Sequence, residues 1–389
     1  MKICAVICEY NPFHSGHAHL ISELKRRGYD VLCLMSGSFT QRGSAAVISK
    51  YSRAASAVKG GADLVLELPF PYCSLGAAGF AEGGVSLARS LGCVSALGFG
   101  CECGNAEKLM LAAKNALLPE FQAKLADLGG ERYAERVSAV YSEMLGDDAP
   151  SGSNDILAIE YLKAIISCGS EIVPVAVRRD GKDYNSGDIA GTVSATAARN
   201  AVLSGNIDPL RGLLPDDSYE ALRKALATGG IARDENLFLP YAAMFRTAKP
   251  ADICGASCVN AELASRIVAA SREAVSFCDM TARIKTKLYS DSAIRRALLF
   301  AFTGVGAHEI TSPAFTTVLA ANKTGREMLS AMEKTSSVPI ITKPADYKMY
   351  GDGVSRAFEA SLRAESLWTL ALDRPREAGY LMRRSPLMI

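Results

Sequence analysis

The sequence lacks the features that mark membrane, secreted and strongly charged proteins. No apolar stretch approaches the roughly 20 residues that a membrane-spanning helix needs. The apolar part of the N-terminal segment MKICAVICEY is too short for a secretion signal. Basic and acidic residues number 43 and 41, so only a local basic patch could hold a polyanionic partner. These absences predict a globular, cytoplasmic protein.

The eleven cysteines lack the spacing of a zinc motif. Most lie in apolar runs, where a reduced thiol packs as a small hydrophobic side chain. The pairs Cys101 with Cys103 and Cys254 with Cys258 have neither the two-residue spacing of a zinc knuckle nor a nearby histidine. We therefore expect reduced core thiols and no metal site.

Apolar runs alternate with helical patterns over the first 205 residues. Runs of strand length predict strands at 2–10, 31–37, 63–70, 94–100 and 171–177. Helical periodicity predicts helices at 19–28, 50–61, 83–92, 154–169 and 194–205, with a helical insertion at 105–150. This alternation is typical of βαβ units, so we expect a Rossmann-like α/β fold with a doubly wound, mostly parallel sheet.

Helical patterns dominate the second half of the chain. Amphipathic segments at 214–230, 237–247, 260–276 and 290–304 predict helices, and a short β-α-β-like stretch at 313–343 interrupts them. We therefore divide the chain into an α/β domain at 1–205 and a mainly α-helical domain at 206–389.

Histidine is scarce, and three of the four histidines fall in the segment EYNPFHSGHAHL at 9–20. The segment follows the first predicted strand and opens a helix, where free N–H groups and the helix dipole favour an anion. His14 and His17 share one helical face, and Gly16 lets the backbone approach a ligand. Zinc is disfavoured because His17 and His19 diverge on a helix and no Cys or carboxylate lies at a suitable offset. The segment predicts a phosphate site.

The pattern H-x-G-H after the first strand is the signature of the adenylyl-transferring HIGH superfamily. Further segments at 35–58, 60–73, 97–102, 153–162 and 284–299 resemble, in order and spacing, the bacterial tRNA(Met) cytidine acetate ligase family. The resemblance covers nearly the whole chain. It implies ATP-dependent activation of acetate to acetyladenylate and transfer of the acetyl group to N4 of the wobble cytidine of elongator tRNA(Met).

The resemblance also implies which residues bind ATP, with His14 and His17 as the catalytic pair. The implied contacts are Ile7, Cys8, Glu9, Tyr10, Asn11, Pro12, Phe13, His14, Ser15, Gly16, His17, Ala18, His19, Leu20, Gly100, Asn154 and Arg179. Arg178 competes with Arg179, which has the family-like spacing to the following GKDY. Gly100 ends a strand and leaves room for adenine or ribose, or is a plain turn glycine. Asn154 is equally suited to cap a helix.

Further polar groups are candidates for the triphosphate. Related nucleotidyltransferases bind β- and γ-phosphates with a Ser/Thr-containing helix start and a basic residue, which indicates Ser194, Thr196 and Arg199; a plain helix cap is the alternative. Lys50 and Arg53 share a helical face that contacts triphosphate or RNA, or is simply solvated. We expect Mg²⁺ as a cofactor because triphosphate chemistry needs charge neutralisation.

A basic stretch, TARIKTKLYSDSAIRR at 281–296, is the best local candidate for tRNA binding. Its cations neutralise backbone phosphates, and its tyrosine is suited to stack on an unpaired base; a solvated face is the alternative. The predicted tRNA contacts are Arg283, Lys285, Lys287, Arg295 and Arg296. The helical domain would thus dock the anticodon arm.

Two other functions stay open on the sequence. One is a small-molecule adenylyltransferase that uses ATP and a phosphorylated acceptor. The other is a nucleotide-binding RNA chaperone without catalysis, which would tolerate loss of His17 because binding alone does not need transition-state stabilisation.

Overall fold

A parallel sheet forms the centre of the computed structural model, which describes residues 1–128, 133–150, 152–179 and 194–389. Its strands follow the order β5-β4-β1-β2-β3 and are β1 (Ile3–Cys8), β2 (Asp30–Ser36), β3 (Leu64–Leu68), β4 (Val94–Cys101) and β5 (Val173–Arg178). All five lie where strands are predicted, and all neighbours are parallel. The first three are almost entirely buried, which explains their nearly continuous apolar sequence.

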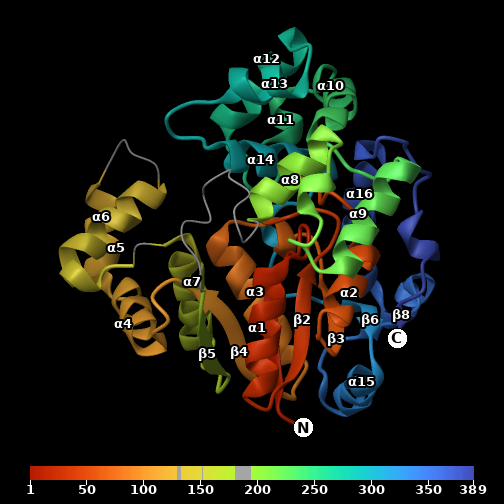
Figure 1. Cartoon of the computed structure of the whole chain (residues 1–389). Coiled ribbons are helices and arrows are strands. Elements are labelled where there is room, and N and C mark those ends of the chain that lie inside the picture. The colour runs from red at the N-terminus through yellow and green to blue at the C-terminus, as the bar shows by residue number, and fades with distance from the viewer. Residues whose placement is uncertain (129–132, 151, 180–193) are drawn as a thin grey trace.

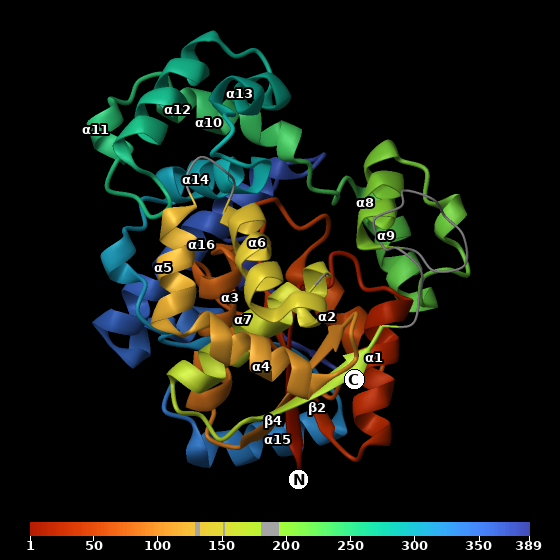
Figure 2. The same cartoon turned by 90° about the vertical axis from the view of Figure 1, so that its left-hand side faces the viewer.

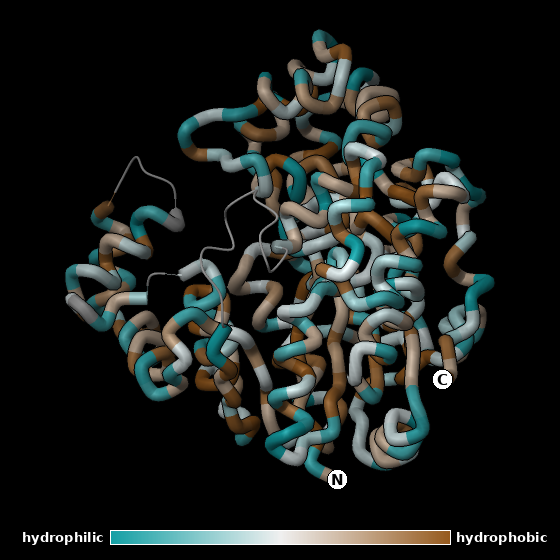
Figure 3. The backbone as a smooth tube through the Cα atoms, in the orientation of Figure 1, coloured by the Kyte–Doolittle hydropathy of each residue, from teal (hydrophilic) through white to brown (hydrophobic). Residues whose placement is uncertain are grey.

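Helices cover both faces of the sheet, so the predicted doubly wound α/β fold is confirmed (Figure 1). The connecting helices are α1 (Ser15–Arg26), α2 (Lys50–Lys59), α3 (Ala77–Ser90), α7 (Ser153–Ser167) and α8 (Ala195–Ser204). Alternate residues of β1 enter two different hydrophobic clusters, one shared with α1 and α2 and the other with α3 and α7. The backbone tube is accordingly brown along the strands and teal at the periphery (Figure 3).

The predicted insertion is helical where the structure describes it. It comprises α4 (Ala106–Ala116), α5 (Pro119–Asp127) and α6 (Tyr133–Leu145), which lie beside α7 (Figure 2). The polar loop expected at 178–192 falls almost wholly outside the described residues.

The second half is mainly helical, as predicted. Its longer helices are α9 (Asp216–Thr228), α10 (Phe238–Phe245), α12 (Ala261–Glu273), α13 (Phe277–Ile284), α14 (Asp291–Thr303) and α16 (Asp352–Ala371), with the short α11 (Pro250–Ile253). Short 3-10 helices occur in both halves of the chain, at Tyr72–Ser74, Gly146–Asp148, Asp208–Leu210, Asp234–Leu237, Ala307–Glu309, Pro344–Tyr350 and Leu381–Arg383. Helices α10 to α14 gather at the end of the molecule toward which the parallel strands run (Figure 1).

The β-α-β-like stretch extends the central sheet, which the sequence pattern did not predict. Strand β6 (Thr316–Ala321) pairs antiparallel with β3, and α15 (Lys323–Thr335) follows it. Two short strands pair with β6, namely β7 (Ile340–Ile341) and β8 (Leu387–Met388). The C-terminal half therefore completes a sheet that the N-terminal half begins.

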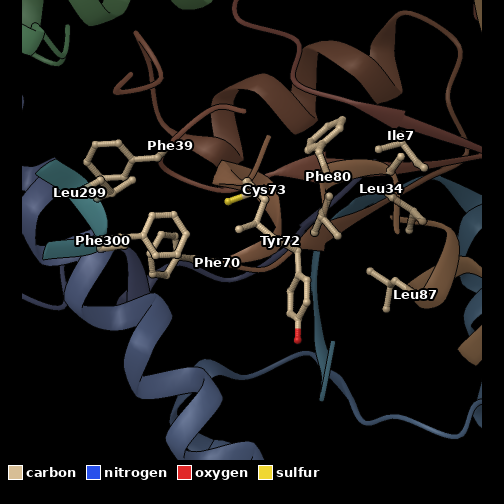
Figure 4. Packing of buried hydrophobic residues seen from close by; sticks show 14 of the residues in the cluster. Ile7, Leu34, Phe39, Phe70, Tyr72, Cys73, Phe80, Leu87, Leu299 and Phe300 are labelled. Carbon is tan, nitrogen blue, oxygen red and sulfur yellow. The ribbon is translucent and has the colours of Figure 1, made fainter. Parts of the chain in front are cut away.

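One hydrophobic core runs from the sheet into the C-terminal helices. Phe70 and Phe300 meet with ring centroids 5.2 Å apart, and Phe39 and Leu299 belong to the same hydrophobic cluster (Figure 4). The buried indole of Trp368 donates to the Ala46 carbonyl at 2.8 Å. These contacts hold the loop after β2 against α14 and α16.

Membrane insertion through a helix has no support in the described part of the chain. No helix there combines the length and the apolar character needed to cross a bilayer.

Candidate functional site

The strand order predicts a ligand crevice at the carboxyl ends of β1 and β4. The chain moves from β1 to β2 and β3 on one side and then crosses to β4 on the other, which makes β1/β4 the switch point of the sheet. Ligands of open α/β sheets bind at this point, outside the strand ends. The histidine segment follows β1, Gly100 is the second-last residue of β4, and Arg179 follows the adjacent β5.

His14 and His17 form a stacked pair at the start of α1. The Gly16 N–H donates to Nδ1 of His14 at 3.1 Å, and the His14 N–H donates to Nδ1 of His17 at 3.2 Å. The ring centroids lie 3.6 Å apart. Because each Nδ1 accepts a backbone hydrogen bond, each neutral imidazole carries its proton on Nε2. The pair therefore offers two N–H donors fixed in orientation by the backbone.

Burial and nearby arginines keep both imidazoles neutral. Burial, together with the smaller effect of the positive charges of Arg179 and Arg199, lowers the pKa of His14 to about 3. Burial, His14 and Arg179 likewise hold the pKa of His17 well below its usual value. Since Arg179 and Arg199 act on the same imidazole, the two predicted cationic positions converge on the histidine pair.

The aromatic neighbours of His17 fix its ring. Tyr10 and Phe13 lie 4.7 Å and 5.7 Å from it, centroid to centroid. Both are buried, and the Tyr10 hydroxyl contacts the Cys33 sulfur at 3.3 Å. These predicted ATP contacts thus support a histidine and also belong to the core.

Other members of the 7–20 segment have side chains away from the crevice. Ile7 and Cys8 enter the clusters on opposite faces of the sheet. His19 is exposed on α1 beside Glu23. Leu20 is half-buried against the α1 side of the core. The resemblance implies ATP contacts along the whole segment, whereas these four side chains lie in the core or on the surface of α1.

Gly100, Asn154 and Arg179 come together, as the resemblance implies. Arg179 Nη1 donates to Asn154 Oδ1 at 3.3 Å. A Cβ at Gly100 would lie 3.2 Å from Cγ of Arg179, so the glycine leaves room for the arginine. Arg178 is exposed and lies against Gly104 instead. The geometry therefore favours Arg179 over Arg178 at the crevice.

Asn154 does not cap α7, which corrects one of its two predicted roles. The N-cap position is Gly152, and Asn154 lies inside the first turn. Glu102 supplies the cap, since its carboxylate accepts from the N–H groups of Asn154 at 3.2 Å and Asp155 at 2.8 Å. It also accepts from Nδ2 of Asn154 at 2.6 Å and so orients that amide toward Arg179. The sequence pattern gave no sign of this role because Glu102 lies 52 residues from Asn154.

Helix α8 lies close to the histidine segment. Ser194 caps it by accepting from Ala197 N–H at 3.1 Å, so the helix-cap alternative is confirmed for this residue. Arg199 donates to Thr196 Oγ1 at 2.9 Å and to the Asn11 carbonyl at 3.0 Å. The second of these bonds ties α8 to the segment that precedes α1.

Lys50 and Arg53 are buried, which contradicts both predicted roles for them. Lys50 pairs with Glu67 at 2.8 Å and with Glu365 of α16. Arg53 donates to the Glu9 carbonyl at 2.5 Å and to the Gly37 carbonyl. Neither is solvated, and neither is available to triphosphate or RNA. Both have structural roles: Arg53 holds the segments after β1 and β2, and Lys50 joins α2 to β3 and α16.

The predicted tRNA contacts fall into two groups. Arg283, Lys285 and Lys287 are exposed around the turn between α13 and α14. Arg283 pairs with Glu273 at 2.6 Å and Lys285 with Asp291 at 2.8 Å, both in exposed surroundings. Such exposed pairs exchange readily for phosphate partners because they contribute little stability.

Arg295 and Arg296 have intramolecular partners. Arg295 pairs with Asp234 at 3.1 Å, and Arg296 donates to the Gln41 carbonyl at 3.2 Å. Gly43 approaches the backbone of this helix so closely that a Cβ would lie 2.6 Å from the Arg296 nitrogen. Arg296 therefore fastens α14 to the loop after β2, and Arg295 fastens it to the 3-10 helix Asp234–Leu237.

Comparisons with known proteins identify the family of this chain. The family model described as HIGH Nucleotidyl Transferase matches residues 1–380. The tRNA(Met) cytidine acetate ligase of Acetivibrio thermocellus is 32% identical, covering 97% of this chain and 98% of that one. The ligase of Fervidobacterium nodosum is 35% identical, covering 90% and 85%.

Two solved structures have the same fold as this chain. The crystal structure of Thermotoga maritima TmcAL bound with alpha-thio ATP matches with a TM-score of 0.89 at 27% identity, over the whole of both chains. The apo form of that protein matches with a TM-score of 0.91. The chain therefore belongs to the HIGH nucleotidyl transferase family and, within it, to the tRNA(Met) cytidine acetate ligases.

Proposed function

We propose that this protein uses ATP to activate acetate as acetyladenylate and then transfers the acetyl group to N4 of the wobble cytidine of elongator tRNA(Met). The observation that carries the proposal is the stacked His14–His17 pair at the carboxyl end of β1, in which each Nδ1 accepts a backbone N–H and leaves Nε2 as the donor. A tRNA substrate agrees with the cytoplasmic location expected from the sequence.

The first step needs stabilisation of charge at the α-phosphate. A carboxylate oxygen of acetate attacks the α-phosphorus, the bond to the β-phosphate oxygen breaks, and pyrophosphate leaves. Negative charge builds on the phosphate oxygens during this step, and preorganised N–H donors lower its energy. His14 and His17 supply two such donors, while Arg179 and Arg199 supply positive charge beside them. The imidazoles need not take up a proton.

The second step joins the acetyl group to the RNA base. The N4 amine of cytidine attacks the acetyl carbonyl carbon, AMP leaves, and one N4 proton passes to solvent. This order requires the tRNA to reach the crevice after adenylate formation. The helices α10 to α14 stand at the same end of the molecule as the crevice, with Arg283, Lys285 and Lys287 exposed on and beside them. We propose that residues 1–205 hold the nucleotide and residues 206–389 dock the tRNA.

We propose that Mg²⁺ binds together with the triphosphate of ATP. In the described ranges, the one grouping of three metal-ligating side chains contains two sulfurs, which Mg²⁺ does not favour. The ion would therefore be held chiefly by phosphate oxygens and would neutralise part of their charge.

Exchange of pyrophosphate into ATP tests the first step. The purified protein is incubated with ATP, labelled pyrophosphate and Mg²⁺, with and without acetate, in the absence of RNA. We expect exchange that depends on acetate. Exchange that instead requires a phosphorylated small molecule would replace the proposal with a cofactor adenylyltransferase, and nucleotide binding without any exchange would indicate a non-catalytic protein.

A further inference from the structure

A cluster of metal-ligating side chains lies beside the nucleotide crevice and has no part in the proposed reaction. Sγ of Cys101, Sγ of Cys103 and a carboxylate oxygen of Asp155 all lie within 4.8 Å of one another. Cys101 ends β4, Cys103 is two residues further on, and Asp155 belongs to the first turn of α7. Sequence spacing gave only the two sulfurs, because the carboxylate comes from a different element.

We propose that Cys101, Cys103 and Asp155 bind one zinc ion, with a water molecule as the fourth ligand. Zinc binds Cys sulfur at about 2.3 Å and carboxylate oxygen at about 2.0 to 2.2 Å, so ligand atoms on one tetrahedral ion lie about 3.5 to 4 Å apart. The observed separations are within a small side-chain adjustment of that geometry. Each thiol loses its proton to solvent as the ion binds.

Backbone N–H groups hold the Asp155 carboxylate in a fixed orientation. Oδ1 of Asp155 accepts from the N–H groups of Glu102 at 2.8 Å and Cys103 at 3.2 Å. Asp155 is only 2% exposed, so its orientation is fixed by packing as well. Hydrogen bonds that orient a ligand from outside the metal shell are typical of zinc sites. Cys103 is half-buried, which leaves a route for the ion and the water.

The chemistry of the cluster favours a cation. Two thiols and a carboxylic acid lie close enough together to reach one divalent ion, and each becomes an anionic ligand when the ion binds. A soft ion suits the two sulfurs.

The bound ion would stabilise the geometry of the proposed ATP site and would not take part in the reaction. It joins the end of β4, which carries Gly100, to the start of α7, which carries Asn154. Loss of the ion should therefore raise KM for ATP more than it lowers kcat. This consequence depends on the proposed function, but metal binding itself does not.

Metal content is measured on the full-length protein, purified without a polyhistidine tag and dialysed after incubation with zinc. We expect about one zinc per chain in the wild type and much less in Cys103→Ser and Asp155→Asn. The second variant keeps the shape of the side chain and its carbonyl oxygen for the backbone N–H groups. Circular dichroism confirms that each variant is folded, and Cys278→Ser, at an exposed cysteine on α13, is the control that keeps its zinc.

Cobalt gives a second readout that does not depend on enzyme activity. Co²⁺ bound to thiolate sulfur should give a near-ultraviolet charge-transfer band in the wild type that is absent from Cys103→Ser. No zinc and no cobalt band in the wild type would overturn the proposal. Zinc retained in full by the folded Asp155→Asn and Cys103→Ser variants would overturn it as well, because the ion would then lie elsewhere.

Discussion

At the scale of single residues, His14 and His17 can act as hydrogen-bond donors while both imidazoles stay neutral. Nδ1 of both imidazoles is occupied by a backbone N–H, and both pKa values are lowered. The pair resembles an oxyanion-binding site built from side chains, in which orientation matters more than basicity.

Replacing His17 with Ala should reduce kcat for acetate-dependent pyrophosphate exchange by about 10²-fold or more, because a donor aimed at the transition state is removed. The change in KM for ATP should be smaller. Steady-state exchange kinetics measure both quantities. His19→Ala, an exposed neighbour on the same helix, is the control and should behave as the wild type. A His17 variant that changed KM alone would refute the transition-state role.

Arg178 and Arg179 are adjacent in the sequence but differ in position, so substitutions at the two can be compared directly. Arg179→Ala should raise KM for ATP about tenfold or more, since one charge-assisted hydrogen bond contributes about 1.5–3 kcal/mol. Arg178→Ala should leave KM nearly unchanged, because this side chain is exposed and lies over Gly104. Initial rates at varied ATP test the contrast. Equal effects of the two substitutions would contradict the placement of Arg179 in the crevice.

His14 should make the protein less stable in acid. Its folded pKa of about 3 lies below the ordinary value of 6.5, so the unfolded chain binds the extra proton first. The free energy of unfolding should fall as pH drops from about 6.5 toward 3, by at most about 1.4 kcal/mol per pH unit from this group. Urea unfolding at several pH values measures the slope. His14→Asn keeps a side-chain acceptor for the cap, and its slope should be shallower; an identical slope would exclude His14 as a source.

At the scale of elements, helix α2 is joined to both halves of the chain by charges buried within the protein. Burial alone would lower the pKa of Lys50, but the carboxylates of Glu365 on α16 and Glu67 on β3 raise it well above its ordinary value. The two carboxylates therefore favour the charged form of the lysine. The cluster specifies where α16 lies against the sheet.

Lys50→Ala should lower the free energy of unfolding by about 3–5 kcal/mol, because it leaves two buried carboxylates without a partner. Chemical denaturation measures the loss. Lys59→Ala, at the exposed end of the same helix, removes an ion pair with Asp217 and should cost about 0–1 kcal/mol. Similar losses for the two variants would show that the buried cluster contributes nothing special.

Local signals in the sequence predicted the elements well but not their long-range partners. The five parallel strands followed from apolar runs, and the crevice followed from placing H-x-G-H after the first of them. The sequence did not indicate that Lys50 is buried, because its partner Glu365 lies 315 residues away and a charged side chain carries no local sign of burial. Strand β6 was expected as a strand, but nothing near it indicates pairing with β3. Only the folded chain shows these relations.

At the scale of the whole molecule, the crevice and the exposed basic turn lie toward the same end, where a large RNA reaches both. Lys285→Ala combined with Lys287→Ala should weaken tRNA binding and reduce the slope of log K against log salt by about 0.7–0.9 for each phosphate that is no longer neutralised. Filter binding at several salt concentrations tests this. Lys334→Ala, exposed on α15 away from this end, is the control. An unchanged slope in the double variant would remove the turn from the RNA interface.

The pairing of β6 with β3 also has a consequence for synthesis on the ribosome. The edge of β3 stays open until β6 emerges, which requires roughly 250 further residues, or about 12–50 s at ~5–20 residues per second. During that interval the nascent chain presents the unpaired edge of a largely apolar strand, which is the kind of edge that invites misassembly. The translating cell must therefore keep that edge from pairing with other chains until the last third of this chain has been made.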